Sequence, residues 1–273
     1  MIDSHTHLTG PPYSQEQLVW PIVEGGSFTA PFTRAEGKPE YLLKDMDQRG
    51  IEKALVMGFP NTITNQQLSE VMREHPNRII GFASVRDPKS SEAVTELKDA
   101  VEKLGLKGLK LHPDIHSFSP SDPEIFPLIR CAADLNVPVL IHCLPGGMIR
   151  GYFDLNTPGH IDTLKKHVPE ATIILAHMGW PRYMDVLSVG QIPGVYVETS
   201  WGLTSIAELN GIQYTSKLLR MIGADNIVFG SDWCTKQIGM EQEKQIKLIE
   251  SLDLSRDEKD KILGENIRQA MNL

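Results

Sequence analysis

Histidines at the ends of apolar segments are the residues of this sequence best suited to chemistry. His5 and His7 follow Ile2 in a short segment that we expect to form a β-strand. Side chains alternate between the two faces of a strand, so both imidazoles should lie on one face, with Cα atoms roughly 6.5–7 Å apart. Such a pair can share a metal ion, or it can be two polar residues at a strand end.

Three later segments have the same pattern, in which a polar side chain directly follows an apolar run. These side chains are His142, His177 and Asp232. Each alone could be structural, as a hydrogen-bonded core histidine or as an aspartate in a turn or helix cap. Their meaning depends on whether the fold brings the ends of these segments together.

The elements that would position these residues alternate regularly. Apolar, β-branched segments predict eight buried strands at residues 2–5, 54–59, 79–85, 106–111, 138–142, 172–177, 195–199 and 227–231. Helical patterns lie between them at residues 66–74, 91–104, 125–135, 157–167, 181–189 and 203–222, and two more follow at 241–252 and 255–271. This order predicts an α/β fold, a (β/α)8 TIM barrel in which residues 1–273 form a single domain.

A doubly wound open sheet is the structural alternative. No Gly-x-Gly-x-x-Gly follows the first strand, which argues against its dinucleotide-binding form. In a barrel the carboxyl ends of all strands meet at one face, where active sites are built. His5, His7, His142, His177 and Asp232 would then converge, and together they predict a metal site.

Residues 8–53 interrupt the alternation, because typical loops have only about 4–6 residues. Residues 42–49 are expected to hold the first barrel helix, and the remainder is rich in proline, glycine and aromatic residues. We predict a long loop insertion after the first strand that lies over the catalytic mouth. It could be a lid, a subunit contact in a homodimer, or a packing element.

The ordered set of motifs resembles the amidohydrolase superfamily, and within it the amidohydrolase-2 branch that includes aminocarboxymuconate-semialdehyde decarboxylase-like enzymes. The matching motifs are Asp3-Ser4-His5-Thr6-His7, Gly108-Leu109-Lys110-Leu111-His112-Pro113, Leu140-Ile141-His142, Leu175-Ala176-His177-Met178-Gly179 and Gly230-Ser231-Asp232-Trp233. They run from residue 3 to residue 233, so the resemblance covers the whole predicted barrel.

The resemblance implies one divalent metal ion, with His5, His7, His142 and Asp232 as its ligands. His177 would position or deprotonate a metal-bound water, and Asp232 would also act in catalysis by receiving a proton. Three imidazoles and one carboxylate suit Zn²⁺, the expected ion, with Mn²⁺ as the alternative. Zn²⁺ can lower the pKa of bound water to about 7, so hydroxide would be available at neutral pH.

Five further residues are candidate substrate contacts. Lys110 could pair as a cation with a substrate carboxylate; it could instead be carbamylated, as in some amidohydrolases, or structural. His112 could contact substrate or shape its loop, and Arg150 could bind a carboxylate or be solvated. Trp180 and Trp233 follow ligand-bearing strands and are expected to line the pocket.

These residues favour a metal-dependent hydrolase of a small organic-acid-type substrate, such as a lactone, amide or ester. The alternative is a metal-dependent decarboxylase, a carbon–carbon lyase acting on an aromatic or unsaturated carboxylic acid. Both use the same ligands, so the sequence leaves them open. A non-catalytic binding barrel would predict a disrupted ligand set, whereas all five positions at the strand ends are intact.

The composition limits the partners. The chain has 273 residues, a net charge of −8 and no long basic run, which argues against nucleic acid or an anionic membrane and leaves a small, anionic molecule as the expected substrate. Its three cysteines form neither a CxxC motif nor a disulfide framework, and no secretory signal or long apolar run is evident. These features predict a cytoplasmic protein.

Overall fold

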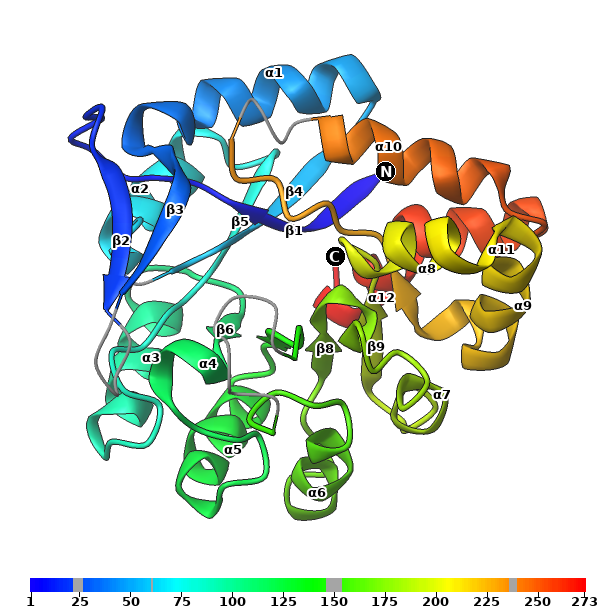
Figure 1. Ribbon diagram of the computed structural model, residues 1–273. Helices are drawn as coiled ribbons and strands as arrows, with labels where there is room; N and C mark the ends of the chain where they lie inside the picture. The colour runs from blue at the N-terminus through cyan, green and yellow to red at the C-terminus, as the bar shows by residue number, and fades with distance from the viewer. Residues whose placement is uncertain (22–26, 60, 146–153, 236–239) are drawn as a thin grey trace.

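The computed structural model describes residues 1–21, 27–59, 61–145, 154–235 and 240–273. Eight strands form a ring with helices around it, as the sequence predicted, so the fold is an α/β TIM barrel (Figure 1). The barrel strands are β1 (Ile2–His7), β4 (Lys53–Met57), β5 (Ile79–Phe82), β6 (Leu109–Leu111), β7 (Val139–Ile141), β8 (Ile173–Leu175), β9 (Val195–Glu198) and β10 (Ile227–Val228). All eight lie within or beside the predicted segments.

The ring consists of two parallel sheets that meet at two seams. One sheet has the order β1-β4-β5 and the other the order β10-β9-β8-β7-β6. At the first seam Ala83 pairs with Leu109 in a parallel bridge. At the second seam Thr6 pairs with Trp233, and the Ser4 amide donates to the Phe229 carbonyl at 2.9 Å. The barrel is therefore closed by residues from opposite ends of the chain.

Most predicted helices are present, although α7 (Val186–Val189) keeps only the last four residues of the predicted helix at 181–189. Those of the outer layer are α1 (Pro39–Arg49), α2 (Asn65–Glu74), α3 (Glu92–Glu102), α5 (Phe126–Asp134), α6 (His160–His167), α7 (Val186–Val189), α8 (Gly202–Asn210), α9 (Ile212–Ile222) and α10 (Met240–Ser251). The predicted helix at 203–222 is two helices, because Gly211 between them has a φ of +83°. The last predicted helix consists of α11 (Arg256–Asp260), a π-helical turn η5 (Lys261–Glu265) and α12 (Asn266–Met271).

Four short elements complete the outer structure. They are α4 (Pro113–His116) and the 3-10 turns η2 (Pro123–Ile125), η3 (Ala176–Gly179) and η4 (Ala224–Asn226). Two of them follow barrel strands directly, so the chain turns as soon as it leaves the barrel. Among the described residues, no helix combines the length and the apolar character needed to cross a membrane.

The segment predicted as a long loop after the first strand contains regular structure. Strands β2 (Gln17–Pro21) and β3 (Ser27–Thr33) pair antiparallel, and the turn η1 (Arg34–Glu36) leads to α1. Leu18 and Phe32 of this hairpin pack with Phe59 and Ile115, which follow barrel strands β4 and β6. The hairpin is therefore anchored beside the carboxyl ends of the strands.

Apolar side chains fill the part of the barrel interior nearest the amino ends of the strands. We call this set the apolar layer: Ile2, Leu55, Met57, Ile80, Phe82, Leu140, Ile174, Ala176, Val228 and, from α12, Ile267. Gly108 makes room for the largest of them, because a Cβ at this position would come within 2.5 Å of the Phe82 ring. The interior is thus packed up to the level where the polar residues begin.

Candidate metal centre and active site

A bulge in β1 directs His5 and His7 into the barrel. Asp3 pairs with Ala54 and Thr6 pairs with Val56. Between these two pairs, β1 contains one residue more than β4. One extra residue reverses which side chains face inward. Ile2 therefore faces the apolar layer, while His5 and His7 face the same interior one level higher.

His5, His7 and Asp232 form the centre of the site. The Nε2 atoms of the two histidines lie 3.2 Å apart, and Oδ1 of Asp232 lies 3.4 Å from that of His5 and 3.1 Å from that of His7. Burial opposes ionisation of Asp232, but the two imidazoles outweigh it and hold its pKa well below the usual value. Two nitrogens and a carboxylate oxygen turned toward one point are a donor set that fits a divalent cation.

Glu198, at the end of β9, contacts the ring of His5 on the side away from His7 and Asp232. Its Oε2 lies 2.9 Å from Nδ1 of His5 and also accepts the His177 amide at 3.2 Å and the Ser200 hydroxyl at 2.8 Å. A carboxylate on Nδ1 fixes the tautomer in which Nε2 carries the lone pair that a metal needs. Gly230 leaves space for this carboxylate, since a Cβ there would lie 2.4 Å from Oε1 of Glu198.

Glu198 was not among the residues singled out from the sequence. It ends the apolar segment at residues 195–197, so it has the same signal as His142 and His177, a polar residue directly after a buried strand. Its burial raises its pKa, against the effect of its hydrogen bonds. The sequence does not mark its contact with His5, because the two residues lie 193 positions apart and no fixed spacing connects them.

His142 and His177 lie together beside the centre. Nδ1 of His142 is 3.0 Å from Nε2 of His177, and the ring centroids of His177 and His5 are 5.1 Å apart. Nδ1 of His177 is 2.8 Å from the Ser200 hydroxyl. Burial lowers the pKa of His177 to about 4 and that of His142 well below its usual value. Both rings are therefore neutral near pH 7, as a ligand and a proton acceptor must be.

The far side of His142 faces a second polar group. Nε2 of His142 lies 3.9 Å from Oδ2 of Asp114, whose other oxygen accepts a 2.7 Å hydrogen bond from Asn156. Burial raises the pKa of Asp114 to about 7, although the Asn156 bond lowers it. The ring of His112 stacks on that of His142, with centroids 3.8 Å apart. Asp114 thus lies near His142 without a hydrogen bond to it, unlike Glu198 and His5, and the predicted contact residue His112 packs against a candidate ligand.

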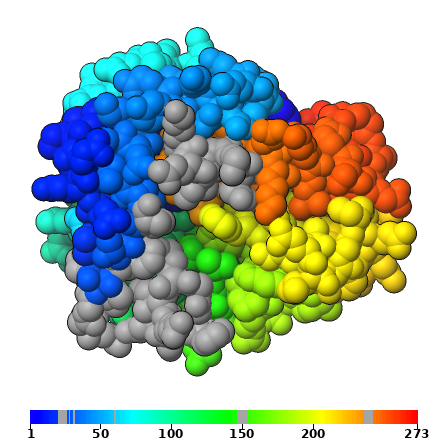
Figure 2. Space-filling view, turned by 45° about the horizontal axis from the view of Figure 1, so that its top comes forward, coloured from blue at the N-terminus to red at the C-terminus, as the bar shows by residue number. Residues whose placement is uncertain are grey.

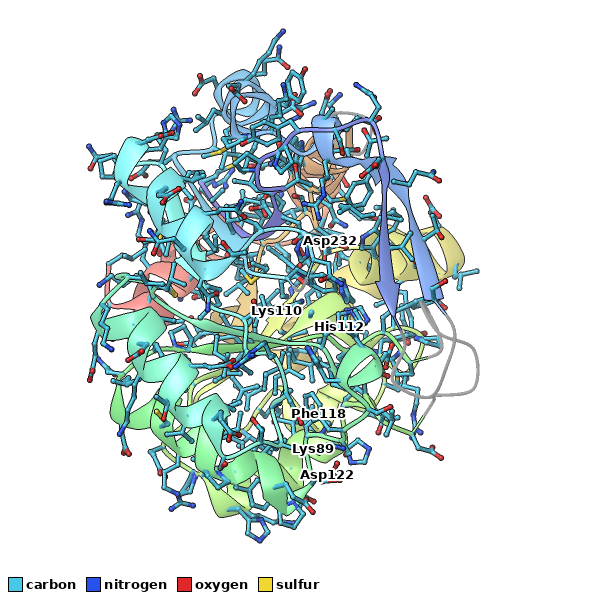
Figure 3. The ribbon with its side chains drawn as sticks, turned by 90° about the vertical axis from the view of Figure 1, so that its left-hand side faces the viewer. Lys89, Lys110, His112, Phe118, Asp122 and Asp232 are labelled. Atoms are coloured by element: carbon cyan, nitrogen blue, oxygen red, sulfur yellow. The ribbon has the colours of Figure 1, made fainter. Side chains whose placement is uncertain are left out.

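Lys110 reaches the centre from β6. Its Nζ lies 3.2 Å from Nε2 of His5, and the side chain is buried. Burial lowers its pKa to about 8, while the carboxylates of Asp232 and Glu198 act in the opposite direction. Figure 3 shows Lys110, His112 and Asp232 in the interior of the molecule. The site therefore contains a buried amine beside the candidate ligands.

The remaining predicted contact residues have different surroundings. Trp233 is fully buried in the core, and its indole N–H donates to Oδ2 of Asp45 on α1 at 2.8 Å, a placement that does not favour the predicted pocket wall. Asp232, which precedes Trp233, has a φ of +58°, and the indole points toward α1 instead of toward the candidate ligands. Trp180 is partly buried and stacks on Tyr183. Arg150 lies outside the described residues.

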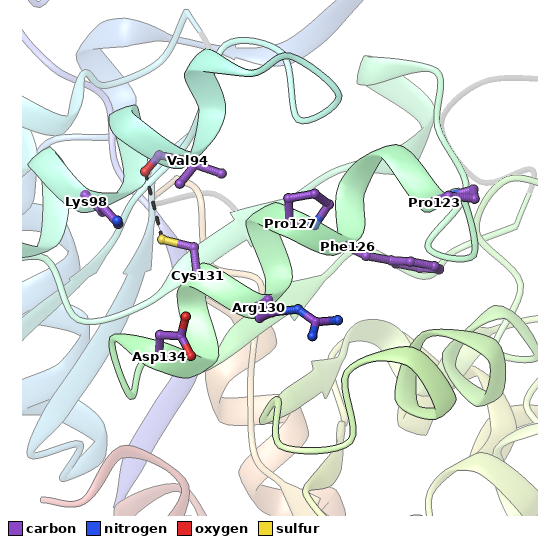
Figure 4. Close-up of a pocket in the computed structure, with 8 residues that line it drawn as sticks. All are labelled: Val94, Lys98, Pro123, Phe126, Pro127, Arg130, Cys131 and Asp134. Carbon is purple, nitrogen blue, oxygen red and sulfur yellow. Dashed lines mark hydrogen bonds between the residues drawn. The ribbon is translucent and has the colours of Figure 1, made fainter.

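A separate concavity lies in the outer helical layer, between α3 and α5 (Figure 4). It has a volume of about 420 Å³ and is lined by residues including Lys98, Phe126, Arg130 and Cys131. These residues belong to outer helices, and none of the histidines at the strand ends takes part. This concavity is therefore separate from the candidate metal centre.

Comparison with known proteins identifies the family of this chain. The family model described as "Amidohydrolase" matches residues 2–272. The 2-amino-3-carboxymuconate-6-semialdehyde decarboxylase of Dictyostelium discoideum is 28% identical over 78 residues, which are 29% of this chain and 22% of that protein. The matched region thus spans about a fifth of this relative's length.

Two solved structures share the fold at low sequence identity. The probable 2-pyrone-4,6-dicarboxylic acid hydrolase of Acinetobacter baumannii, with citric acid bound, has a TM-score of 0.70 and 18% identity, covering 100% of this chain and 99% of that one. The 5-carboxyvanillate decarboxylase of Novosphingobium aromaticivorans, in complex with manganese and 4-hydroxy-3-methoxy-5-nitrobenzoic acid, has a TM-score of 0.68 and 17% identity, with coverages of 88% and 82%. Because the family model covers nearly the entire chain, this protein belongs to the amidohydrolase family of enzymes.

Proposed function

We propose that this protein is a metal-dependent decarboxylase of a small aromatic or unsaturated carboxylic acid. The observation that carries the proposal is the amine of Lys110, buried 3.2 Å from a candidate metal ligand. An amine and a cation on the same wall offer two positive partners to an anionic substrate, in a site with little water. The decarboxylase relative and the decarboxylase among the structural neighbours favour the lyase over the hydrolase that the sequence first suggested.

We further propose His5, His7, His142 and Asp232 as the metal ligands. A divalent ion held there would polarise a substrate oxygen and neutralise negative charge. The nitrogen and oxygen donors suit either Zn²⁺ or Mn²⁺, and the manganese bound by 5-carboxyvanillate decarboxylase makes Mn²⁺ the first ion to test. Elemental analysis of the purified protein measures which of the two it carries.

Different residues of the chain then carry out the two steps of the reaction. Lys110 holds the substrate carboxylate, whose bond to the adjacent carbon breaks and leaves the electron pair on that carbon. A proton must replace the carbon dioxide. We assign this transfer to His177, which is neutral near pH 7 and must therefore take a proton from water at one ring nitrogen as it gives one up at the other. Ser200, 2.8 Å from His177 Nδ1 and 2.8 Å from Oε2 of Glu198, holds the ring for this transfer.

The second candidate is hydrolysis of a cyclic ester or related substrate. His177 can also take a proton from an attacking water, and one structural neighbour is a probable pyrone dicarboxylic acid hydrolase. In this reaction Lys110 would hold a carboxylate that is not lost. The residues required are the same, and only the fate of the substrate carbons differs.

Isotopes distinguish the two reactions. The protein loaded with Mn²⁺ or Zn²⁺ is incubated with 5-carboxyvanillate and with 2-pyrone-4,6-dicarboxylate in D₂O and in H₂¹⁸O. The decarboxylase releases carbon dioxide and places deuterium on the product carbon without gaining ¹⁸O. Incorporation of ¹⁸O with all carbons retained would establish the hydrolase instead, and Lys110→Met should suppress whichever reaction occurs.

A further inference from the structure

Three consecutive strands of the barrel are followed, within four residues of their ends, by a residue with a positive φ angle. After β8, β9 and β10 these residues are His177, Trp201 and Asp232, with φ angles of +59°, +56° and +58°. Histidine and aspartate tolerate this region better than most residues, whereas for a bulky side chain such as tryptophan it is a genuine outlier. His177 and Asp232 already belong to the candidate site, whereas Trp201 has no role there so far.

Trp201 is the central residue of a tight γ-turn. Its φ of +56° and ψ of −51° are close to the strained form of that turn, and the Gly202 amide donates to the Ser200 carbonyl across it. The turn is pressed against the site, because a Cβ on Gly202 would lie 2.1 Å from the His177 carbonyl oxygen. A strained turn that holds a tryptophan at this location suggests that the side chain has a function there.

The side chain of Trp201 links the candidate metal centre to the surface. Its indole N–H donates a 2.8 Å hydrogen bond to Oδ2 of Asp232, the oxygen that does not face His7. Yet 40% of the residue is exposed, although large aromatic rings are usually well buried. Helix α8, which begins at the next residue, lies on the surface in Figure 2, in yellow. One edge of the ring therefore holds a candidate ligand, and part of the ring remains open.

We propose that Trp201 is a positioning and specificity-determining residue for the planar substrate of this enzyme. Its N–H occupies Oδ2 of Asp232 and thereby leaves Oδ1 for the cation. Its exposed face forms the platform on which the unsaturated or aromatic part of the substrate stacks, while Lys110 holds the carboxylate. This proposal rests on the proposed function, because a stacking platform requires a planar acid as substrate.

The two roles can be separated by substitution. Trp201→Phe retains an aromatic face and removes the N–H, whereas Trp201→Leu removes both. An aromatic stacking partner contributes about a tenfold change in affinity, and loss of a group that holds a metal ligand weakens metal binding about tenfold or more. Tyr214→Leu is the matched control, because Tyr214 is an exposed aromatic residue of the outer helix α9.

Calorimetry on the Mn²⁺-loaded protein tests the platform, with 4-hydroxy-3-methoxy-5-nitrobenzoic acid as the planar probe and citrate as the non-planar one. We expect Trp201→Leu to bind the planar acid about tenfold more weakly and citrate within about twofold of wild type. Trp201→Phe should bind the planar acid within about threefold of wild type but Mn²⁺ about tenfold more weakly. Tyr214→Leu should change none of these affinities. If Trp201→Leu does not fold, Trp201→Met takes its place.

The platform is disproved if the planar acid fails to bind wild type, or if it binds Trp201→Leu as tightly as wild type. It is also disproved if Trp201→Leu lowers the affinities for the planar acid and for citrate equally. The positioning role is disproved if Trp201→Phe binds Mn²⁺ like wild type. All of these readouts are independent of turnover. A protein that decarboxylates nothing, but in which Trp201→Leu loses only the planar probe, would refute the proposed reaction and support the platform.

Discussion

The barrel interior has two halves of opposite character, although the same strands build both. On β7, Leu140 belongs to the apolar layer, and His142, two residues later, belongs to the candidate site. Val228 of β10 is apolar, and Asp232, four residues further along the chain, is a candidate ligand. The side-chain period of two keeps Leu140 and His142 on one face, whereas on β1 the bulge turns His5 and His7 inward. The apolar layer thus stabilises the barrel, and the polar residues beyond it form the candidate site.

This division predicts that changes in the polar half alter activity and metal content, while changes in the apolar layer alter folding. The largest effect should come from His177→Ala, which removes the residue that moves the proton. We expect activity to fall about 10²–10⁴-fold with metal content nearly retained. His142→Ala, in contrast, should lose most of the metal, as measured by elemental analysis.

The control for both variants is His167→Ala, because His167 is exposed on the outer helix α6. It should resemble wild type in metal content and activity. Equal loss of metal in His142→Ala and His177→Ala would contradict the separate roles given to these two histidines.

The next effect concerns the apolar layer. Phe82 is fully buried there, against Gly108. Phe82→Ala should reduce the free energy of unfolding by about 3–5 kcal/mol, because it leaves a cavity in the barrel. Denaturant titration measures this loss. The folded protein should still bind one equivalent of metal, and a loss of metal binding in the folded variant would show that the two halves are not independent. Tyr41→Ala, on the exposed side of α1, should change the stability by about 0.5 kcal/mol or less.

The smallest effect should come from Glu198→Gln, at the boundary between the halves. The amide can still accept hydrogen bonds, but it no longer supplies the charge that fixes His5. Metal affinity should fall about 10–100-fold with the thermal midpoint nearly unchanged. Metal titration and a melting curve on the same sample test this. A large drop in the thermal midpoint without loss of metal affinity would place Glu198 among the structural residues.

Much of the fold was accessible from the sequence, because buried parallel strands have long apolar segments and are separated by amphipathic helices. The convergence of His5, His7 and Asp232 followed from the position of each at a strand end. The bulge in β1 was not predicted, since an extra residue is visible only against the partner strand. Nor was the β2–β3 hairpin, whose prolines and glycines resemble those of a loop.

The residues that hold the ligands were the least accessible part of the site. Glu198 contacts His5 and Trp201 contacts Asp232, and in both pairs the two residues lie far apart in the sequence. No fixed spacing connects these pairs. Trp233, whose side chain points outward, follows a residue with a positive φ, Asp232, and no sequence pattern marks such a change of direction.

The seam between β1 and the end of β10 has a consequence for biosynthesis. Asp232 emerges from the ribosome more than 220 residues after its partners His5 and His7, and the Ser4–Phe229 hydrogen bond spans a comparable interval. A nascent chain therefore carries the two histidines through this interval before the aspartate of the candidate centre is made. An ion can contact all three side chains only when the cylinder has closed, so occupancy of this centre would report that the barrel is complete.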